Sequence, residues 1–330
     1  MRTSSPTAEQ ALRSCFADCE REAGVFVILG DRVDELRAMV ADFTVVDRQS
    51  LRACVADEAG RYDPWSSKSI EQVFTRLDSP WFGAVLRDRS LRFQYQPIVD
   101  AVTGEVFAHE ALMRAFRGDQ PISPDALVRS AKAHDALLVL DQACWRAAIE
   151  QSEMYLRTGG RVFINFFPIT VYDPEVCLAT TFAAAERAGA DISQLTFEVV
   201  ESEAFPDIDH LKSILAAYRE RGAKVALDDL GSGNTAILFI DQLNPDLIKI
   251  DREVLRRAVV TGETSMFIGL IRYAQERGIT TIAEGLETLA ELDFCRELGV
   301  DYVQGYLVGR PSREFMTQPF DPYEDLDAAA

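Results

Sequence analysis

Long apolar runs are missing from this 330-residue sequence. No run approaches the roughly 20 apolar residues that a membrane-spanning helix needs. The first residues, MRTSSPTAEQALRSC, also lack the apolar stretch of a signal peptide. With 48% hydrophobic and 26% charged residues, the composition is that of a soluble globular protein. We therefore expect a cytoplasmic protein with no membrane span, long enough for one large domain and one small one.

Cysteine and histidine are scarce as well, with six and three residues. The cysteines are scattered through the chain, which is not the pattern of a disulfide framework. We expect His109 and His134 to be packing or surface residues rather than metal ligands. In the case of His109, the alternation of a strand turns it to the opposite face from Glu110.

Basic residues are too few to balance the acidic ones. The chain has 34 Lys and Arg against 53 Asp and Glu, which gives a formal net charge of −19. A negative field of this size repels nucleic acid polymers and anionic membranes. If the substrate carries phosphate, divalent cations are needed to bring it close to acidic side chains.

From about residue 91 onward, short apolar runs alternate with longer amphipathic segments that often end in Gly after Arg, a usual helix stop. The strand-like runs are 91–99, 105–112, 161–167, 195–200, 224–229, 247–251, 280–285 and 302–306. Repeated strand–helix units of this length predict a parallel sheet, either doubly wound or closed into a barrel. Residues 1–85 differ: 25–30 could be a strand, 57–69 reads as a loop, and 70–77 as a helix.

Polar side chains interrupt the apolar strands at or near their C-terminal ends. They are Glu110, Asn165, Glu198, Asp228, Lys249 and Glu284, each on a different strand. In a βα barrel these strand ends form the rim where active sites lie. A buried, unpaired carboxylate is costly, so a separate salt bridge for each residue would require several independent coincidences. We therefore expect the six side chains to converge on one site.

Asp228 and Asp229 stand side by side at the end of an apolar strand, where their charges repel. Oxygen ligands without histidine or cysteine suit hard cations such as Mg²⁺ or Mn²⁺. If Asp228 bridges two cations and Asp229 binds one of them, the two positive ions outweigh the repulsion. The sequence thus predicts a site for two divalent cations.

Seven motifs in order resemble those of the EAL domain, the family of cyclic di-GMP phosphodiesterases. They are YQPIVDAVTGEVFAHEALMR, INFF, FEVVESE, VALDDLGSGN, LIKID, IAEGLET and VQGYLVGRP, and the resemblance covers roughly residues 86–316. It implies a TIM-like (β/α)8 barrel with one antiparallel strand over 86–318, preceded by a small N-terminal α/β domain. Residues 1–85 would be that regulatory or docking domain, and 319–330 an acidic C-terminal tail.

The resemblance also implies an activity, the opening of cyclic di-GMP to linear pGpG with two Mg²⁺ or Mn²⁺ ions per active site. The residues that match ligands of the first metal are Glu110, Asn165, Glu198 and Asp228. Those that match ligands of the second are Asp228, Asp229 and Glu284. Lys249 resembles the family residue that holds the nucleophilic water, and Glu201 resembles the residue that anchors the loop after the two aspartates. Glu287 is similar to a further acidic residue of the family. The residues that resemble substrate contacts are Gln96, Leu112, Arg114 and Gln304.

The motifs depart from the usual family pattern in three places. The loop 229–236 reads DLGSGNTA where DFGTGYSS is usual, Asn165 is followed by Phe166-Phe167 instead of a hydrophobic residue and Ser, and AFRGDQPIS after Arg114 lacks the usual HP. None of these changes removes a metal ligand. The loop serves metal organisation and dimer contact in the family, so activity and dimerisation are the properties that its changes affect.

Three functions remain open at this point. The first is a phosphodiesterase that forms a homodimer through its barrel and is regulated by residues 1–85. The second is a cyclic di-GMP receptor with negligible turnover that signals through residues 1–85 or a partner protein. The third is a protein-interaction module that binds no nucleotide, which the complete polar set disfavours. Two details are also open: Asp251 could contact metal ligands or cap a helix, and Tyr306 could pack beneath Gln304.

Overall fold

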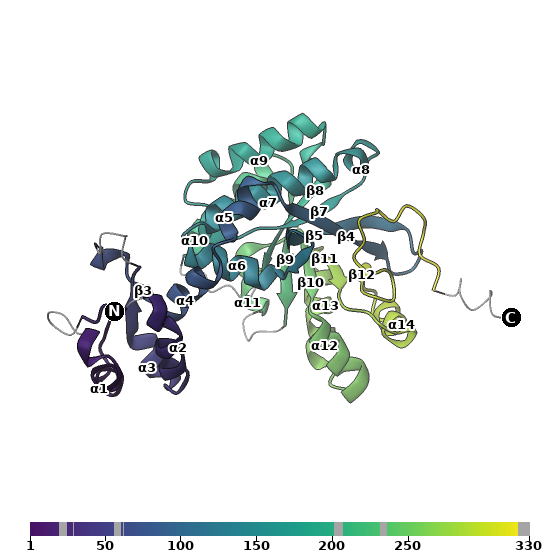
Figure 1. The fold of residues 1–330 in the computed structure, drawn as a ribbon. Coiled ribbons are helices and arrows are strands. Elements are labelled where there is room, and N and C mark those ends of the chain that lie inside the picture. Colours follow the sequence, from purple (N-terminus) through teal and green to yellow (C-terminus); the bar gives the residue numbers. More distant parts are fainter. Residues whose placement is uncertain are drawn as a thin grey trace. The chain divides into compact units, whose positions relative to one another are not determined.

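The computed structural model describes residues 1–19, 25–28, 30–55, 61, 63–200, 207–231 and 236–322. The chain divides into two compact units (Figure 1). The first comprises Met1–Arg87 together with Ser123–Leu137, and the second comprises Asp88–Ile122 together with Leu138–Ala330. Within the described residues, no helix is both long and apolar enough to cross a membrane.

The first unit combines short helices with a small antiparallel sheet of order β1-β2-β3. Its strands are β1 (Arg2–Thr3), β2 (Leu51–Ala53) and β3 (Lys68–Ser69). Its helices are α1 (Pro6–Cys15), α2 (Val33–Ala41), α3 (Val45–Ser50), α4 (Ile70–Asp78), α5 (Phe82–Arg87) and α6 (Pro124–Ala133). Leu12, Phe16, Leu36 and Leu51 are among the residues of its core. The helix predicted at 70–77 is confirmed as α4.

The strand predicted at 25–30 is wrong for the residues described there. Residues 25–28 lie in none of the three strands of this sheet. Phe26 exchanges two backbone hydrogen bonds of 2.8 Å with Met1, and its side chain is buried in the core. Val27 donates its N–H to the carbonyl of Cys19 at 2.9 Å, so the backbone here has isolated hydrogen bonds rather than a continuous ladder, and an apolar run was mistaken for a strand.

In the second unit, eight strands among the described residues close into a barrel; they are labelled in Figure 1. The strands are β4 (Leu91–Asp100), β5 (Val106–Arg117), β7 (Val162–Asn165), β8 (Leu195–Val200), β9 (Lys224–Leu230), β10 (Leu247–Ile250), β11 (Thr280–Ala283) and β12 (Tyr302–Gln304). The order around the barrel is β4-β12-β11-β10-β9-β8-β7-β5, and β5 pairs with β4 to close it. A short strand, β6 (Gln120–Ile122), extends β5 outside the ring. The barrel alternative is therefore confirmed over the doubly wound sheet.

One strand of the barrel runs against the others. β4 is antiparallel to both β5 and β12, whereas the remaining neighbours are parallel. The turn between β4 and β5 is short, with Asp100 accepting the backbone N–H groups of Val102 and Thr103 and with Gly104 at φ 72°. A parallel crossover requires a dozen or more residues, so this connection enforces a hairpin. The antiparallel strand implied by the family resemblance is confirmed.

Helices follow most of the strands and cover the outside of the barrel. They are α7 (Leu137–Gln151), α8 (Glu153–Arg157), α9 (Pro174–Ala188), α10 (Ile208–Glu220), α11 (Ala236–Leu243), α12 (Arg252–Arg256), α13 (Ser265–Arg277) and α14 (Leu289–Glu297). Asp207 caps the start of α10 with its side chain, and Gly278 ends α13 at φ 68°. These caps supply partners or turn geometry where backbone groups have none within the helix.

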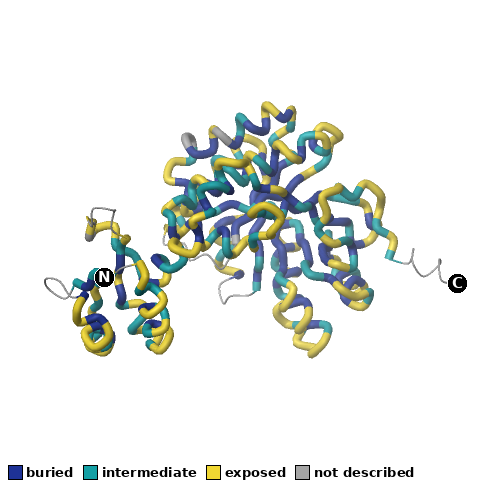
Figure 2. The backbone as a smooth tube through the Cα atoms, viewed as in Figure 1, coloured by how far each residue is buried: buried dark blue, intermediate teal, exposed yellow. Residues whose placement is uncertain are grey.

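Apolar side chains fill one layer inside the barrel and leave the next layer polar. Figure 2 colours most of the barrel strands dark blue, as buried. The buried members of the apolar layer are Ile98, Ala108, Phe163, Ala226, Leu247 and Ile282, with Phe107 and Tyr302 packed against them. Side chains two positions apart on a strand share a face. Glu110, Asn165, Asp228, Lys249 and Glu284 each lie two positions beyond a member of the layer, and therefore project from the next level toward the strand ends.

Candidate active site

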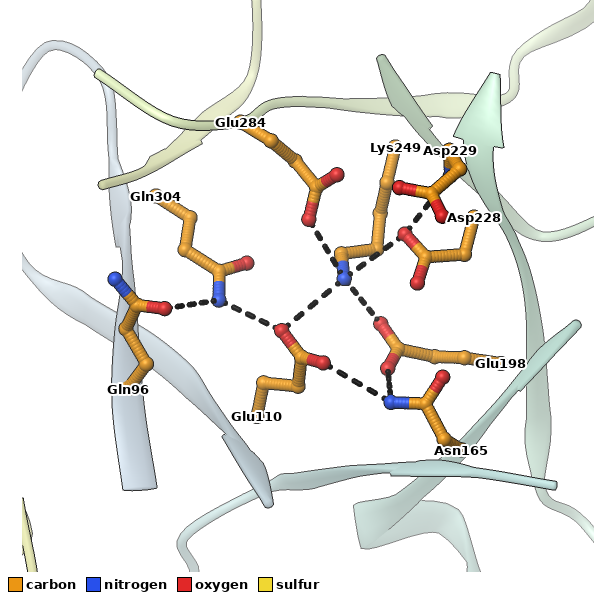
Figure 3. Close-up of polar contacts among 9 residues, drawn as sticks. All are labelled: Gln96, Glu110, Asn165, Glu198, Asp228, Asp229, Lys249, Glu284 and Gln304. Atoms are coloured by element: carbon orange, nitrogen blue, oxygen red, sulfur yellow. Dashed lines mark hydrogen bonds and ion pairs between the residues drawn. The ribbon is translucent and has the colours of Figure 1, made fainter. Parts of the chain in front are cut away.

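Lys249 occupies the centre of the polar layer and is only 1% exposed (Figure 3). Its Nζ lies 3.2 Å from an oxygen of Glu110, 2.8 Å from Glu198, 3.1 Å from Asp228 and 2.8 Å from Glu284. These four carboxylates come from four other strands or strand ends. The convergence predicted for the charged residues at the strand ends is therefore what the structure shows.

Amide side chains connect the carboxylates around this centre. Asn165 Nδ2 donates to Glu110 Oε1 and to Glu198 Oε2, both at 3.0 Å. Gln304 Nε2 donates to Glu110 Oε2 at 2.8 Å and to Gln96 Oε1 at 3.3 Å (Figure 3). Through these bonds the strands β4, β5, β7, β8 and β12 hold one network. The amides and the ammonium of Lys249 together restrain the orientation of Glu110 and Glu198.

The two adjacent aspartates adopt a special backbone geometry. Asp229 has φ 56°, in the left-handed region that residues other than glycine rarely occupy. Its N–H donates to Oδ1 of Asp228 at 3.0 Å. This local hydrogen bond offsets part of the strain, and strained residues of this kind cluster at functional sites.

The carboxylates form two groups that share Asp228. Oxygens of Glu110, Glu198 and Asp228 lie within 4.8 Å of one another, and so do oxygens of Asp228, Asp229 and Glu284. This sharing is the arrangement that the sequence predicted for two cations with one bridging aspartate. Asn165 hydrogen bonds to two members of the first group and lies beside it.

Burial and mutual repulsion shift the acid–base equilibria of these groups. Burial, and then the nearby carboxylates, raise the pKa of Glu198, Asp228 and Glu284 above the ordinary range. Burial and the charge of Asp228 raise the pKa of Asp229 to about 6.

Burial alone would raise the pKa of Glu110 and lower that of Lys249, yet both move the other way. The ammonium of Lys249 and the hydrogen bonds to Glu110 lower the pKa of that carboxyl. The surrounding carboxylates, Asp228 and Glu110 first, raise the pKa of Lys249 well above its ordinary value. Lys249 therefore remains cationic, but one ammonium cannot balance five carboxylates.

The donor atoms fit divalent cations. The donors are carboxylate and amide oxygens, which hard cations such as Mg²⁺ and Mn²⁺ prefer, and their excess negative charge would be neutralised by such ions. Oε1 of Gln304 is buried without a hydrogen-bond partner among the described residues, so the site retains an uncommitted oxygen. Asn165 presents its nitrogen to Glu110 and Glu198, and a half-turn of the amide would present Oδ1 to a cation there.

A cavity of about 240 Å³ opens over these residues. Of the predicted residues, its lining includes Gln96, Glu110, Asp229, Glu284, Glu287 and Gln304; it also includes Asp251, Arg252, Gly285, Gly305 and Tyr306. Asp251 caps α12 by accepting the N–H of Glu253 at 2.8 Å, which settles the open alternative in favour of a cap that also borders the cavity. Tyr306 is 49% exposed and borders the same cavity as Gln304.

Four residues of the cavity lining were not predicted as site residues: Arg252, Gly285, Gly305 and Tyr306. Arg252 follows the end of β10, and its guanidinium pairs with Glu287 at 2.9 Å. Tyr306 lies two residues after β12, and Arg310 stacks on its ring at 4.3 Å. The signal was available, because residues just after barrel strands line the active-site rim.

Several predicted residues lie outside the carboxylate groups, the cavity lining or the described residues. Glu287 belongs to neither carboxylate group, and Leu112 and Arg114 are half-buried on β5 but do not line the cavity. Glu201 and positions 232–235 of the altered loop lie outside the described residues.

His109 and His134 have packing roles, as expected. His109 is fully buried, with Nε2 accepting the N–H of Met316 at 3.0 Å and Nδ1 3.0 Å from the hydroxyl of Tyr155. His134 stacks on Phe82 in the first unit.

Comparison with known proteins agrees with this geometry. The family profile described as EAL domain matches residues 82–311. The chain belongs to the EAL domain family. It is 31% identical over 242 residues to cyclic di-GMP phosphodiesterase NbdA of Pseudomonas aeruginosa, a match that covers 68% of this chain and 29% of the relative. This EAL-domain chain spans less than half of the length of the curated relatives that it matches first.

Solved structures place the chain in the same family. A standalone EAL protein from Vibrio cholerae, in a c-di-GMP-bound form, is 28% identical with a TM-score of 0.62, and the match covers 70% of this chain and 96% of that one. BlrP1 of Klebsiella pneumoniae, as a manganese and cyclic di-GMP complex, is also 28% identical with a TM-score of 0.62. That match covers 68% of this chain and 56% of that one.

Proposed function

We propose that this chain is a divalent-metal-dependent phosphodiesterase that hydrolyses cyclic di-GMP to linear pGpG. The observation that carries the proposal is the pair of carboxylate groups sharing Asp228 around a buried lysine at the strand ends. Relatives named cyclic di-GMP phosphodiesterases and a neighbour described as a manganese and cyclic di-GMP complex support the same activity.

The ligand sets follow from the two groups. Glu110, Asn165, Glu198 and Asp228 would hold one Mg²⁺ or Mn²⁺ ion, and Asp228, Asp229 and Glu284 the other. When bound, such ions activate water at neutral pH and stabilise charge on a phosphodiester. The excess of carboxylate over ammonium supports this occupancy, since buried like charges otherwise require protonation.

Lys249 would orient the attacking water while it remains cationic. Its Nζ already contacts carboxylates of both groups, so a water between them would lie within its reach. Glu284 borders the cavity and would accept the proton as the water attacks phosphorus. The leaving ribose oxygen would depart in line with the attack, which opens the ring and leaves a 5′-phosphate.

Other residues would bind the substrate or support the site. Gln96 and Gln304 hydrogen bond to each other beside Glu110 and border the cavity, so their amides would contact the nucleotide. Leu112 and Arg114 would contact it from β5, with Arg114 on a phosphate. The ion pair of Glu287 with Arg252 supports a role for Glu287 at the cavity edge. Glu201 keeps its proposed role as an anchor of the loop after Asp229.

Assembly and regulation are part of the same proposal. Ile237 and Leu238 on α11 are 48% and 53% exposed and follow the loop that serves dimer contact in the family, which supports a homodimer through the barrel. Residues 1–85 would transmit a signal from a ligand or partner protein. Light scattering of the wild type and of Ile237→Glu would test the dimer, and a monomeric wild type would contradict it.

Turnover of cyclic di-GMP by the purified chain in Mg²⁺ or Mn²⁺ tests the central proposal. The linear product is followed by chromatography, with Glu110→Gln as the matched variant because it keeps the shape and removes one ligand charge. We expect product from the wild type and a loss of at least about 100-fold in the variant. Saturable binding of the nucleotide without product in either ion would refute the phosphodiesterase and leave the receptor function.

A further inference from the structure

Arg114 lies in an unusual electrostatic setting for so acidic a chain. It is on β5 two positions beyond Leu112 and four beyond Glu110, so the three residues share one face of the strand. The side chain is half-buried, yet no carboxylate pairs with it within the described residues. Its guanidinium is held by neutral acceptors: Nε donates to Oε1 of Gln94 at 2.7 Å, and Nη1 donates to the carbonyl of Met113 at 2.9 Å.

Gln94 reaches Arg114 from the reversed strand. On β4 it lies two positions from Gln96, which points toward Gln304 in Figure 3, so both glutamines lie on one face. The register pairs Gln94 with Leu112, and Arg114 is the next residue on the same face of β5. Because β4 runs opposite to β5, its first half meets the end of β5 near the strand-end rim. The antiparallel strand therefore brings Gln94 to this position.

The two acceptors fix the guanidinium without cancelling its charge. A carboxylate in place of the Gln94 amide would neutralise Arg114 with a bidentate pair. An amide instead restrains the side chain, which lowers the entropy lost when an anion binds. Nη2 is then the guanidinium nitrogen without a hydrogen-bond partner in the described part of the chain, and its N–H groups remain available for a ligand.

We propose that Gln94 is a positioning residue that holds Arg114 oriented and uncompensated for a phosphate of the bound nucleotide. This inference rests on the proposed function, in which cyclic di-GMP occupies the neighbouring cavity. Gln94 acts through Arg114 and need not touch the ligand. It differs from the residues already discussed because its effect depends on its neutrality and on the hydrogen bond that it accepts from one arginine.

Two nearly isosteric substitutions of Gln94 separate the effect of its neutral charge from the effect of its hydrogen bond to Arg114. In Gln94→Glu the new carboxylate pairs with Arg114, and we expect binding of cyclic di-GMP to weaken roughly tenfold, the size of one charge-assisted hydrogen bond. Gln94→Met removes the acceptor and adds no charge, so we expect only about a threefold loss. Affinity is measured by calorimetry of the full chain with Ca²⁺, and KM and kcat with Mg²⁺. The KM should rise more than kcat falls.

An Arg114→Met background tests whether the effect passes through the arginine. If it does, adding Gln94→Glu to Arg114→Met changes affinity by less than about twofold. The inference is overturned if Gln94→Glu binds as tightly as wild type, or if its full effect persists without Arg114. A wild type that neither binds nor hydrolyses the nucleotide would instead refute the proposed function, so the two failures are distinguishable.

Discussion

Replacing Lys249 by methionine tests the electrostatic account of the site directly. Methionine fills much of the same volume but has no ammonium, so the carboxylates around position 249 lose the cation that lies 2.8–3.2 Å from four of them. Position 249 is only 1% exposed, and water cannot replace the lost charge without entering the barrel. Removing one partner of a buried ion pair costs about 3–5 kcal/mol.

The loss of folding stability in Lys249→Met should depend on pH in a defined direction. Burial already raises the pKa of Glu198, Asp228 and Glu284, and loss of the ammonium raises each of them further. A carboxyl with a higher pKa in the folded than in the unfolded state stabilises the fold at low pH, and that stability is lost as pH rises above about 4. The difference in stability between wild type and Lys249→Met should therefore widen from pH 5 to pH 8.

Thermal unfolding with EDTA at the two pH values measures this difference. At pH 8 a loss of this size lowers Tm by roughly 10 °C for a domain of about 200 residues. Lys212→Met is the matched control, because Lys212 is 44% exposed and pairs with Asp209 at 3.4 Å on the surface; its Tm should hardly change. If Lys249→Met has the same Tm as the wild type at pH 8, or if the difference in Tm narrows as pH rises, the reasoning about the buried charges is wrong.

Three further predictions concern other parts of the second unit. Because the pKa of Asp229 is raised to about 6 by burial and by Asp228, Mn²⁺ binding must displace a proton below pH 6. Calorimetry should show affinity that rises with pH through pH 6, and a flat profile would contradict the shift. Burial lowers the pKa of His109 to about 4, so the fold should lose roughly 3 kcal/mol as pH falls from 6.5 to 4; denaturant titrations should show that His109→Gln lacks this dependence. A Cβ at Gly305 would lie 2.2 Å from the backbone N and O of Leu286, so Gly305→Ala should lower both Tm and turnover, and an unchanged Tm would refute the close packing.

Local patterns were enough to find the strands and the polar residues at their ends. The predicted run at 195–200 is β8, and most of the others agree with the structure within a few residues. A two-residue period decides which side chains share a face, so Glu110, Lys249 and Glu284 could be assigned to a common layer before any contact was known. The adjacent aspartates at a strand end were equally informative, because their mutual repulsion predicts that cations lie close to them.

Contacts between particular side chains could not be predicted from the sequence in the same way. The position of Lys249 at the centre of four carboxylates depends on closure of the barrel. That closure requires many pairings between strands that are far apart in the sequence. The left-handed backbone of Asp229 and the ion pair of Arg252 with Glu287 arise where loops meet across the rim. The strand predicted at 25–30 failed for a related reason: an apolar run reports burial, whereas a strand requires a neighbouring backbone along its length.

The sequence by itself determined which residues are buried, which faces they share and which chemistry their oxygen atoms favour. The strand–helix alternation by itself indicated parallel strands, and the one antiparallel strand was implied only by the family resemblance. Only the tertiary structure decided that β4 is the reversed strand, and that reversal brings Gln94 beside Arg114. The physical reason is that periodicity and burial are local properties of a chain, whereas strand direction and side-chain partnership are fixed by hydrogen bonds between segments far apart in sequence.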